Sequence, residues 1–223
     1  MEAAELGLLE FFKQTMQIMI PDPTRSYRWT EKECQQLWDD IIRIAKDDSA
    51  GGHFIGTIIY VEHGILRRTP VPRLILLDGQ QRLVTIALLL AALGKADEDA
   101  KHREINDLFL FNGQEKGEFR CKLLPAQGDA ETFFSLINGE EPPPSDSNKL
   151  LKTYYYFKNK ISRDGTDAAL VYKGIAKLTL MDVSVDRPYQ NPKSVCEKLD
   201  FTGLDESQKK LICRWLGLIH SAS

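Results

Sequence analysis

Five consecutive residues, Asp78 to Arg82, place a carboxylate, two carboxamides and a guanidinium between the apolar runs LILL and LVTIALLLAAL. A strand that opens into a helix at such a point exposes backbone N–H groups, which form a recurrent phosphate site. With a phosphate bound there, Arg82 can pair with it in a bidentate manner. Asp78 can hold Mg²⁺, and the carboxamide of Gln80 or Gln81 can orient an attacking water, as a glutamine does in other nucleotide hydrolases.

A purely structural interpretation accounts for part of the same motif. Asp78 can cap the helix with Gln81 as its capping-box partner, and Gly79 permits a sharp turn. This interpretation leaves Gln80 and Arg82 without a role, because a cation at the positive end of a helix dipole is unfavourable unless an anion is present. The chain contains no GxxxxGK[ST] sequence, so it has no P-loop. The residues alone favour an anion site and leave hydrolysis open.

A second stretch, IPDPTRSYRW, interleaves arginines with aromatic residues just before a predicted helix. One interpretation is a loop in which Arg25 and Arg28 meet phosphate while Tyr27 and Trp29 meet a base. The alternative is that Trp29 packs against the first turns of the helix as a hydrophobic staple, with the arginines in solvent. We prefer packing for Trp29 and a functional role for Arg25.

Composition narrows the function classes. The net charge is -3 and the pI is near 5.9, so any contact with DNA must come from a local basic patch. The four cysteines form no CxxC pair, which gives no support to a zinc ribbon or a redox site. The N-terminus is acidic where a signal peptide is basic, and Leu83 to Leu93 is too short to span a bilayer. We therefore expect a cytoplasmic protein.

Periodicity predicts the elements that position these residues. We expect a helix over 4–16, an extended path through Pro21 and Pro23, and a helix that begins with the T-x-x-E capping box of Thr30 and Glu33. HFIGTIIYVE (53–62) and RLILL (73–77) are typical of strands paired as a hairpin, and 83–93 is typical of a fully buried helix. Further along we expect helices over 97–110, 129–137, 150–161 and 167–176, strands over 119–124 and 177–186, a loop over 138–148, and two tail helices around Gly203. The fold class is mixed α/β (α+β), with few strands after residue 125.

Several blocks of the sequence occur in a characteristic order. They are Ile20-Pro21, Arg25, Tyr27, Trp29, LWDDI (37–41), HFIG (53–56), DGQQRL (78–83), Asn191-Pro192 and CEKLDFTGL (196–204). In this order they resemble the N-terminal domain of GmrSD-type restriction endonucleases, a ParB/sulfiredoxin-like family, over nearly the whole chain. The sequence departs from the family pattern at Pro23-Thr24, where the family has Tyr-Gln, and at Cys196, where it has Phe.

The resemblance implies a fold and an activity. The implied fold is a small mixed sheet with helices, followed by a mainly helical C-terminal part. It forms one domain over 1–223, with a sheet-containing, nucleotide-binding half (1–125) and a helical half (126–223). An HNH nuclease domain is not expected in this sequence. The implied activity is that of a nucleotide-binding, Mg²⁺-dependent NTPase, with GTP favoured, which regulates an HNH-type DNA-cleaving partner in modification-dependent restriction or phage defence. The implied catalytic residues are Asp78 (also the metal ligand), Gln80, Gln81 and Arg82, and the implied nucleotide-binding residues are Arg25, Tyr27, Arg28 and Gly79.

Two other functions stay open at this stage. One is a non-catalytic ParB-like module that binds DNA through a local patch or senses a modification, and the other is a degenerate scaffold, suggested by Pro23-Thr24. The oligomeric state also stays open, with a homo-oligomer among the arrangements, and no membrane partner is expected.

Overall fold

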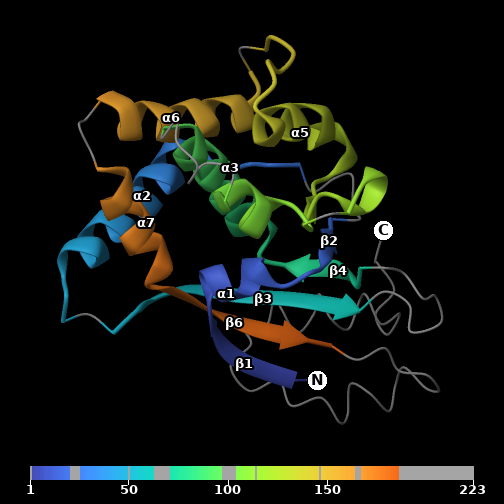
Figure 1. The fold of residues 1–223 in the computed structure, drawn as a ribbon, viewed down its shortest axis with the longest axis horizontal. Coiled ribbons are helices and arrows are strands. Elements are labelled where there is room, and N and C mark those ends of the chain that lie inside the picture. The colour runs from blue at the N-terminus through green and yellow to red at the C-terminus, as the bar shows by residue number, and fades with distance from the viewer. Residues whose placement is uncertain are drawn as a thin grey trace, which may run out of the picture.

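The computed structural model describes residues 2–20, 26–49, 51–62, 71–96, 104–113, 115–145, 147–163 and 167–185. These residues build a six-stranded mixed sheet in the order β1-β6-β3-β4-β2-β5, with the described helices gathered on one side of it (Figure 1). The strands are β1 (Glu2–Gly7), β2 (Gln17–Met19), β3 (His53–Glu62), β4 (Arg73–Asp78), β5 (Leu123–Leu124) and β6 (Leu178–Ser184). The helices are α1 (Leu8–Lys13), α2 (Glu31–Lys46), α3 (Gln80–Ala96), α5 (Ala130–Asn138), α6 (Lys149–Arg163) and α7 (Ala168–Ala176). The predicted mixed α/β class is confirmed.

Strand direction determines which loops meet at which edge of the sheet. β2 lies between β4 and β5 and is parallel to both, whereas β3 is antiparallel to β4. The predicted hairpin of 53–62 with 73–77 is therefore confirmed. β6 lies between β3 and β1, so a strand from the mainly helical half completes the sheet.

Helix α3 occupies the centre of the helical layer. Every residue from Leu83 to Gly94 is buried, because the helix packs against α5, α6, α7 and the π-helical turn η1 (Asn106–Leu110). A helix that is apolar on all sides needs such an environment, as the sequence predicted. Within the described ranges, no helix is both long and apolar enough to cross a membrane.

Three predicted elements differ from the structure. Residues 2–7 form β1 rather than the start of a helix, because they pair with β6, and α1 begins only after Gly7. The strand predicted over 119–124 is reduced to two residues, preceded by the 3₁₀ turn η2 (Gly117–Phe119). Of the helix predicted over 97–110, the described part is a short helical end followed by η1. The Thr30–Glu33 capping box is confirmed, and the tail helices lie outside the described residues.

Lys122 joins the end of α1 to η1 inside the core. Its side chain is 3% exposed, and its Nζ donates to the carbonyl oxygens of Phe12 at 2.6 Å and Leu108 at 2.7 Å. These carbonyls belong to the end of α1 and to η1, which lack enough intrahelical donors. Burial lowers the pKa of Lys122 to about 8, because the charged ammonium loses water.

We expect the free energy of unfolding to rise between about pH 8 and pH 10 relative to that of a Lys122→Met variant. In this range the unfolded chain keeps the Lys122 proton, because its ordinary pKa is 10.5, whereas the folded chain loses it. The difference approaches roughly 3 kcal/mol at the alkaline end. Urea unfolding of both proteins across this range measures it, and a constant difference between them would contradict the assignment.

Candidate functional site

The carboxyl ends of three parallel strands bring the candidate residues together. β4, β2 and β5 run in the same direction, so the segments that follow them emerge at one edge of the sheet. Asp129, beyond β5, accepts the backbone N–H of Tyr27 at 2.6 Å, and Gln81, beyond β4, accepts that of Arg28 at 2.8 Å. The two sequence stretches with candidate chemistry are thus neighbours. Arg25 lies outside the described residues.

Gly79 makes the turn from β4 into α3. It has φ +96, and its carbonyl accepts the first intrahelical hydrogen bond from the N–H of Leu83 at 3.1 Å. A Cβ there would lie 2.3 Å from Cδ1 of Ile58, so a glycine is required on two counts. α3 begins at Gln80, so Gly79 directly precedes its first turn, and the hydrogen bonds of the Gln81 carboxamide go to residues 26–29. Asp78 is instead the last residue of β4, opposite Ile59.

Gln81 holds the segment of residues 26–29. Its Oε1 accepts the N–H groups of Arg28 at 2.8 Å and Trp29 at 3.3 Å, and its Nε2 donates to the carbonyl of Ser26 at 3.2 Å. The whole carboxamide is therefore engaged with backbone. Gln81 acts as a positioning residue, which leaves Gln80 as the candidate for orienting a water.

Tyr27 anchors the same segment in the core. Its ring is 6% exposed, and its hydroxyl lies 2.6 Å from Oγ1 of Thr85 and 3.2 Å from Oγ1 of Thr153. Burial raises the pKa of the phenol well above its usual range. A ring enclosed in this way has no face for a nucleotide base, so the structure gives Tyr27 a packing role. Arg28, the next residue, is exposed.

Arg82 lies against a glycine of the neighbouring strand. Gly56 has φ +112 at a bulge of β3, and a Cβ there would lie only 2.6 Å from Cζ of Arg82. The Nη1 of Arg82 donates to the carbonyl of Thr57 at 3.1 Å. Within the described part of the chain, no carboxylate forms an ion pair with this guanidinium. Backbone thus orients the side chain without neutralising its charge.

The guanidinium of Arg82 lines a cavity of about 340 Å³ between α2, β3 and the start of α3, here called the Arg82 cavity. Such a volume lies within the range of small-ligand sites. Two carboxylates also line it, and each has a partner of its own. Asp40 lies 3.3 Å from Nε2 of His53, and Glu33 accepts the N–H and hydroxyl of Thr30, which lowers the pKa of that carboxyl.

Asp78 is the residue that the sequence predicts as the metal ligand. Mg²⁺ in nucleotide sites binds one or two carboxylates, substrate phosphates and several waters. The part of the chain that the structure describes contains no cluster of three or more His, Cys, Asp or Glu side chains that could cage a metal. Among the described residues, Asp78 offers one half-buried carboxylate at the end of β4, just before the first turn of α3, so a Mg²⁺ held there would need phosphate and water as further ligands.

Sequence reasoning missed the contribution of β3. Gly56 belongs to the HFIG block, and a glycine inside a strand indicates a bulge or a close approach, but the sequence does not indicate that Arg82 is what approaches it. The pairing of Asp40 with His53 had no signal in the sequence, because only the packing of α2 beside β3 brings these residues together.

The sequence matches the family model described as the N-terminal domain of the GmrSD restriction endonuclease over residues 8–212. The chain belongs to this family. The resemblance seen in the sequence is thereby confirmed, and the family is that of a restriction-system component. A comparison with curated proteins found no match.

In this GmrSD N-terminal domain, we expect Gly56→Ala and Arg82→Ala to be non-additive in stability. Gly56→Ala destabilises the fold in two ways: it strains the backbone at positive φ, and its Cβ displaces the guanidinium of Arg82. Only the second effect disappears when Arg82 is replaced. The double variant should therefore be more stable than the sum of the single effects by about 1 kcal/mol. Urea unfolding of the four proteins measures this term, and additivity would show that Arg82 does not rest on Gly56.

We expect Gln81→Leu to release residues 26–29 of the GmrSD domain locally. The substitution removes all three hydrogen bonds to that segment while leaving the apolar packing of α3 intact. Hydrogen exchange of the amides of Arg28 and Trp29 should accelerate at least about tenfold. Gln14→Leu, at an exposed position directly after α1, is the matched control. Equal exchange in both variants would contradict the positioning role.

Proposed function

We propose that this domain binds a nucleoside triphosphate with Mg²⁺ at the Asp78–Arg82 turn and hydrolyses it. The proposal depends on where the guanidinium of Arg82 lies and on what holds it there. The guanidinium lies in the first turn of α3, where a cation is unfavourable without an anion, yet it is oriented by a backbone carbonyl and a glycine beside an open cavity. A bound phosphate would supply the missing anion.

The first turn of α3 would form the rest of the phosphate site. The backbone N–H groups of Gln80, Gln81 and Arg82 precede the first intrahelical hydrogen bond, and the helix dipole favours negative charge at this end. Arg28 is exposed on the segment that Gln81 holds against this turn, so it would provide a second cation. Arg25, which belongs to the same stretch of sequence, is proposed to complete the clamp.

The chemistry is a transfer of the γ-phosphoryl group to water. Gln80 would orient a water whose oxygen bonds to the γ-phosphorus while the bond to the β-phosphate oxygen breaks, giving a nucleoside diphosphate and inorganic phosphate. Arg82 would stabilise the charge that develops on the phosphoryl oxygens. Asp78 would hold Mg²⁺, which when bound offsets the negative charge of the phosphates.

The biological setting follows from the family. Its description is that of a restriction endonuclease, so we infer that the nucleotide state of this domain controls an HNH-type nuclease domain or subunit acting on cytoplasmic DNA. GTP is the proposed nucleotide, on the strength of the resemblance alone.

Turnover of GTP, ATP and CTP with Mg²⁺ tests the proposal. We expect slow phosphate release with one preferred nucleotide, and a loss of roughly 100-fold or more in Arg82→Ala and Asp78→Asn, because each removes charge stabilisation from the transition state. Arg120→Ala is the matched control, since Arg120 contacts Asn138 and the ring of Phe111 instead of the turn.

Two outcomes would count against hydrolysis at this turn. Turnover unchanged in both Arg82→Ala and Asp78→Asn would place the reaction elsewhere. Tight nucleotide binding that depends on Arg82 but gives no phosphate release would favour a non-catalytic, nucleotide-sensing module.

A further inference from the structure

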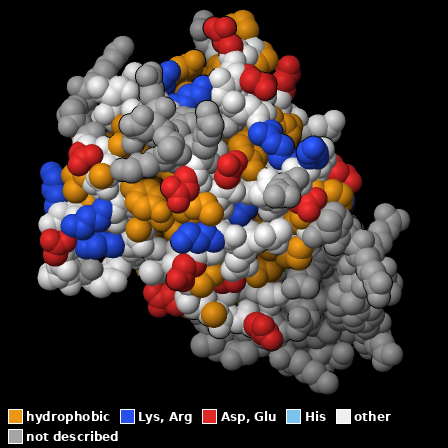
Figure 2. Space-filling model, in the orientation of Figure 1, with side chains coloured by type: hydrophobic (Ala, Val, Ile, Leu, Met, Phe, Trp, Pro, Cys, Tyr) orange, Lys and Arg blue, Asp and Glu red, His pale blue; other side chains and the backbone are white. Residues whose placement is uncertain are grey.

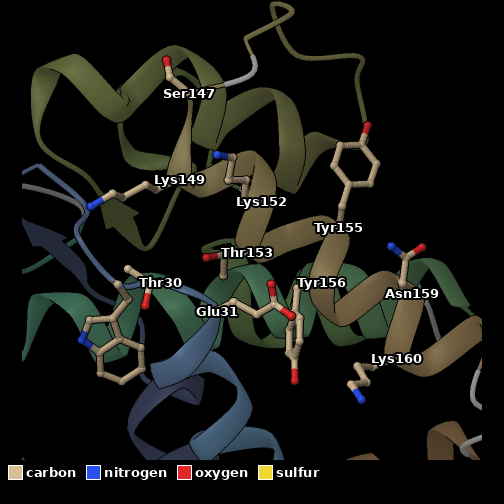
Figure 3. Close-up of a pocket in the computed structure, with 11 residues that line it drawn as sticks. Thr30, Glu31, Ser147, Lys149, Lys152, Thr153, Tyr155, Tyr156, Asn159 and Lys160 are labelled. Carbon is tan, nitrogen blue, oxygen red and sulfur yellow. The ribbon is translucent and has the colours of Figure 1, made fainter.

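A second, larger cavity lies on the other side of residue 29. It has a volume of about 680 Å³ between α6 and residues 29–31, and we call it the α6 cleft. Figure 3 shows Lys149 and Lys152 near one end of α6 and Lys160 further along it, with Glu31 across the cleft. Trp29 lines both this cleft and the Arg82 cavity. None of the roles proposed above for the turn uses the α6 cleft.

The charge of α6 differs from that of the whole chain. Its sequence, KLLKTYYYFKNKISR, carries five basic residues and no carboxylate, although the protein has a net charge of -3. Lys149, Lys152 and Lys160 line the cleft, where Glu31 is the one acidic lining residue among those described. On the face in Figure 2, by contrast, basic and acidic side chains are interspersed around an apolar patch. The α6 cleft is thus a local basic patch of the kind that contact with nucleic acid requires.

The spacing of these lysines follows one helical stripe. Residues 149, 152, 156 and 160 are separated by three or four positions and so share a face of α6. At 1.5 Å per residue the stripe is about 16 Å long. Lys149 already donates to the carbonyl of Arg28 at 3.1 Å, which ties the start of α6 to the opposite wall. Lys152 is exposed and lines the α6 side of the cleft.

Aromatic rings accompany the lysines. Tyr155 is 44% exposed, and it lines the cleft together with Tyr156 and Trp29. In Figure 3, Tyr155 and Asn159 project from one side of α6, whereas Tyr156 and Lys160 project from the other. Exposed rings beside a row of cations are the combination by which proteins bind unpaired strands, because bases stack on the rings while phosphates follow the cations.

We propose that the α6 cleft binds an unpaired nucleic-acid strand, with phosphates on Lys152 and Lys160 and a base on Tyr155. A continuous duplex keeps its bases stacked and offers only phosphates, so it would leave the aromatic wall unused. This site is separate from the turn at Asp78–Arg82, and it does not depend on nucleotide hydrolysis.

Binding of fluorescent twelve-nucleotide strands to the full chain, without nucleoside triphosphate, tests this site. We expect oligo-dT or oligo-rU to bind more tightly than a duplex of equal length, and the tighter of the two identifies the strand as DNA or RNA. Lys152→Glu should weaken binding about tenfold and reduce the slope of log affinity against log salt by about 0.7. Lys46→Glu makes the same charge change at the other end of α2, about 22 Å from Glu31, and should have little effect.

Tyr155→Leu separates stacking from charge. It should also weaken strand binding about tenfold, but with an unchanged salt slope, because no phosphate contact is lost. Far-ultraviolet circular dichroism and urea midpoints verify that each variant is folded. Duplex binding as tight as strand binding, an equal loss in Lys46→Glu, or full affinity in Tyr155→Leu would each overturn the proposal.

Discussion

The architecture of both cavities depends on how residues 26–29 are held against the first turn of α3. Three side chains from different elements do this: Gln81 bonds the backbone of the segment, Asp129 accepts its N–H at Tyr27, and Lys149 donates to its carbonyl at Arg28. The ring of Tyr27 then anchors it in the core beside Thr85 and Thr153. Because Trp29 follows directly, the position of this one segment determines a wall of the Arg82 cavity and a wall of the α6 cleft.

The second constraint is a cation at the wrong end of a helix. The positive charge of Arg82 is unfavourable in the first turn of α3 because the helix dipole is positive there. At the bulge of β3, Gly56 has no side chain, so the guanidinium of Arg82 can lie directly against its backbone. Within the DGQQR motif, Gly79 turns the chain and Gln81 positions a neighbouring segment, and the ligand roles are proposed for Asp78, Gln80 and Arg82.

Local sequence patterns predicted most helices and strands correctly. The predictions failed where a segment's structure depends on a partner that is far away in the sequence. The all-apolar run at 83–93 and the capping box at Thr30 each carry their structural signal within one helix, so both were predicted correctly. Residues 2–7 form a strand only because β6, far away in sequence, pairs with them. The same holds for the site: the turn at Asp78–Arg82 was evident from residue types, but the bonding of Gln81 to residues 26–29 and the contact of Arg82 with Gly56 arise from the fold.

The central claim is that a phosphate occupies the first turn of α3 beside Arg82. Hydrogen exchange of the backbone amides of Gln80, Gln81 and Arg82, with and without a non-hydrolysable GTP analogue and Mg²⁺, tests it most directly, because these amides belong to the first turn of α3. The account predicts that the ligand slows exchange at this turn in the wild type and fails to do so in Arg82→Ala. Protection confined to other segments, with the turn unchanged at saturating nucleotide, would contradict it.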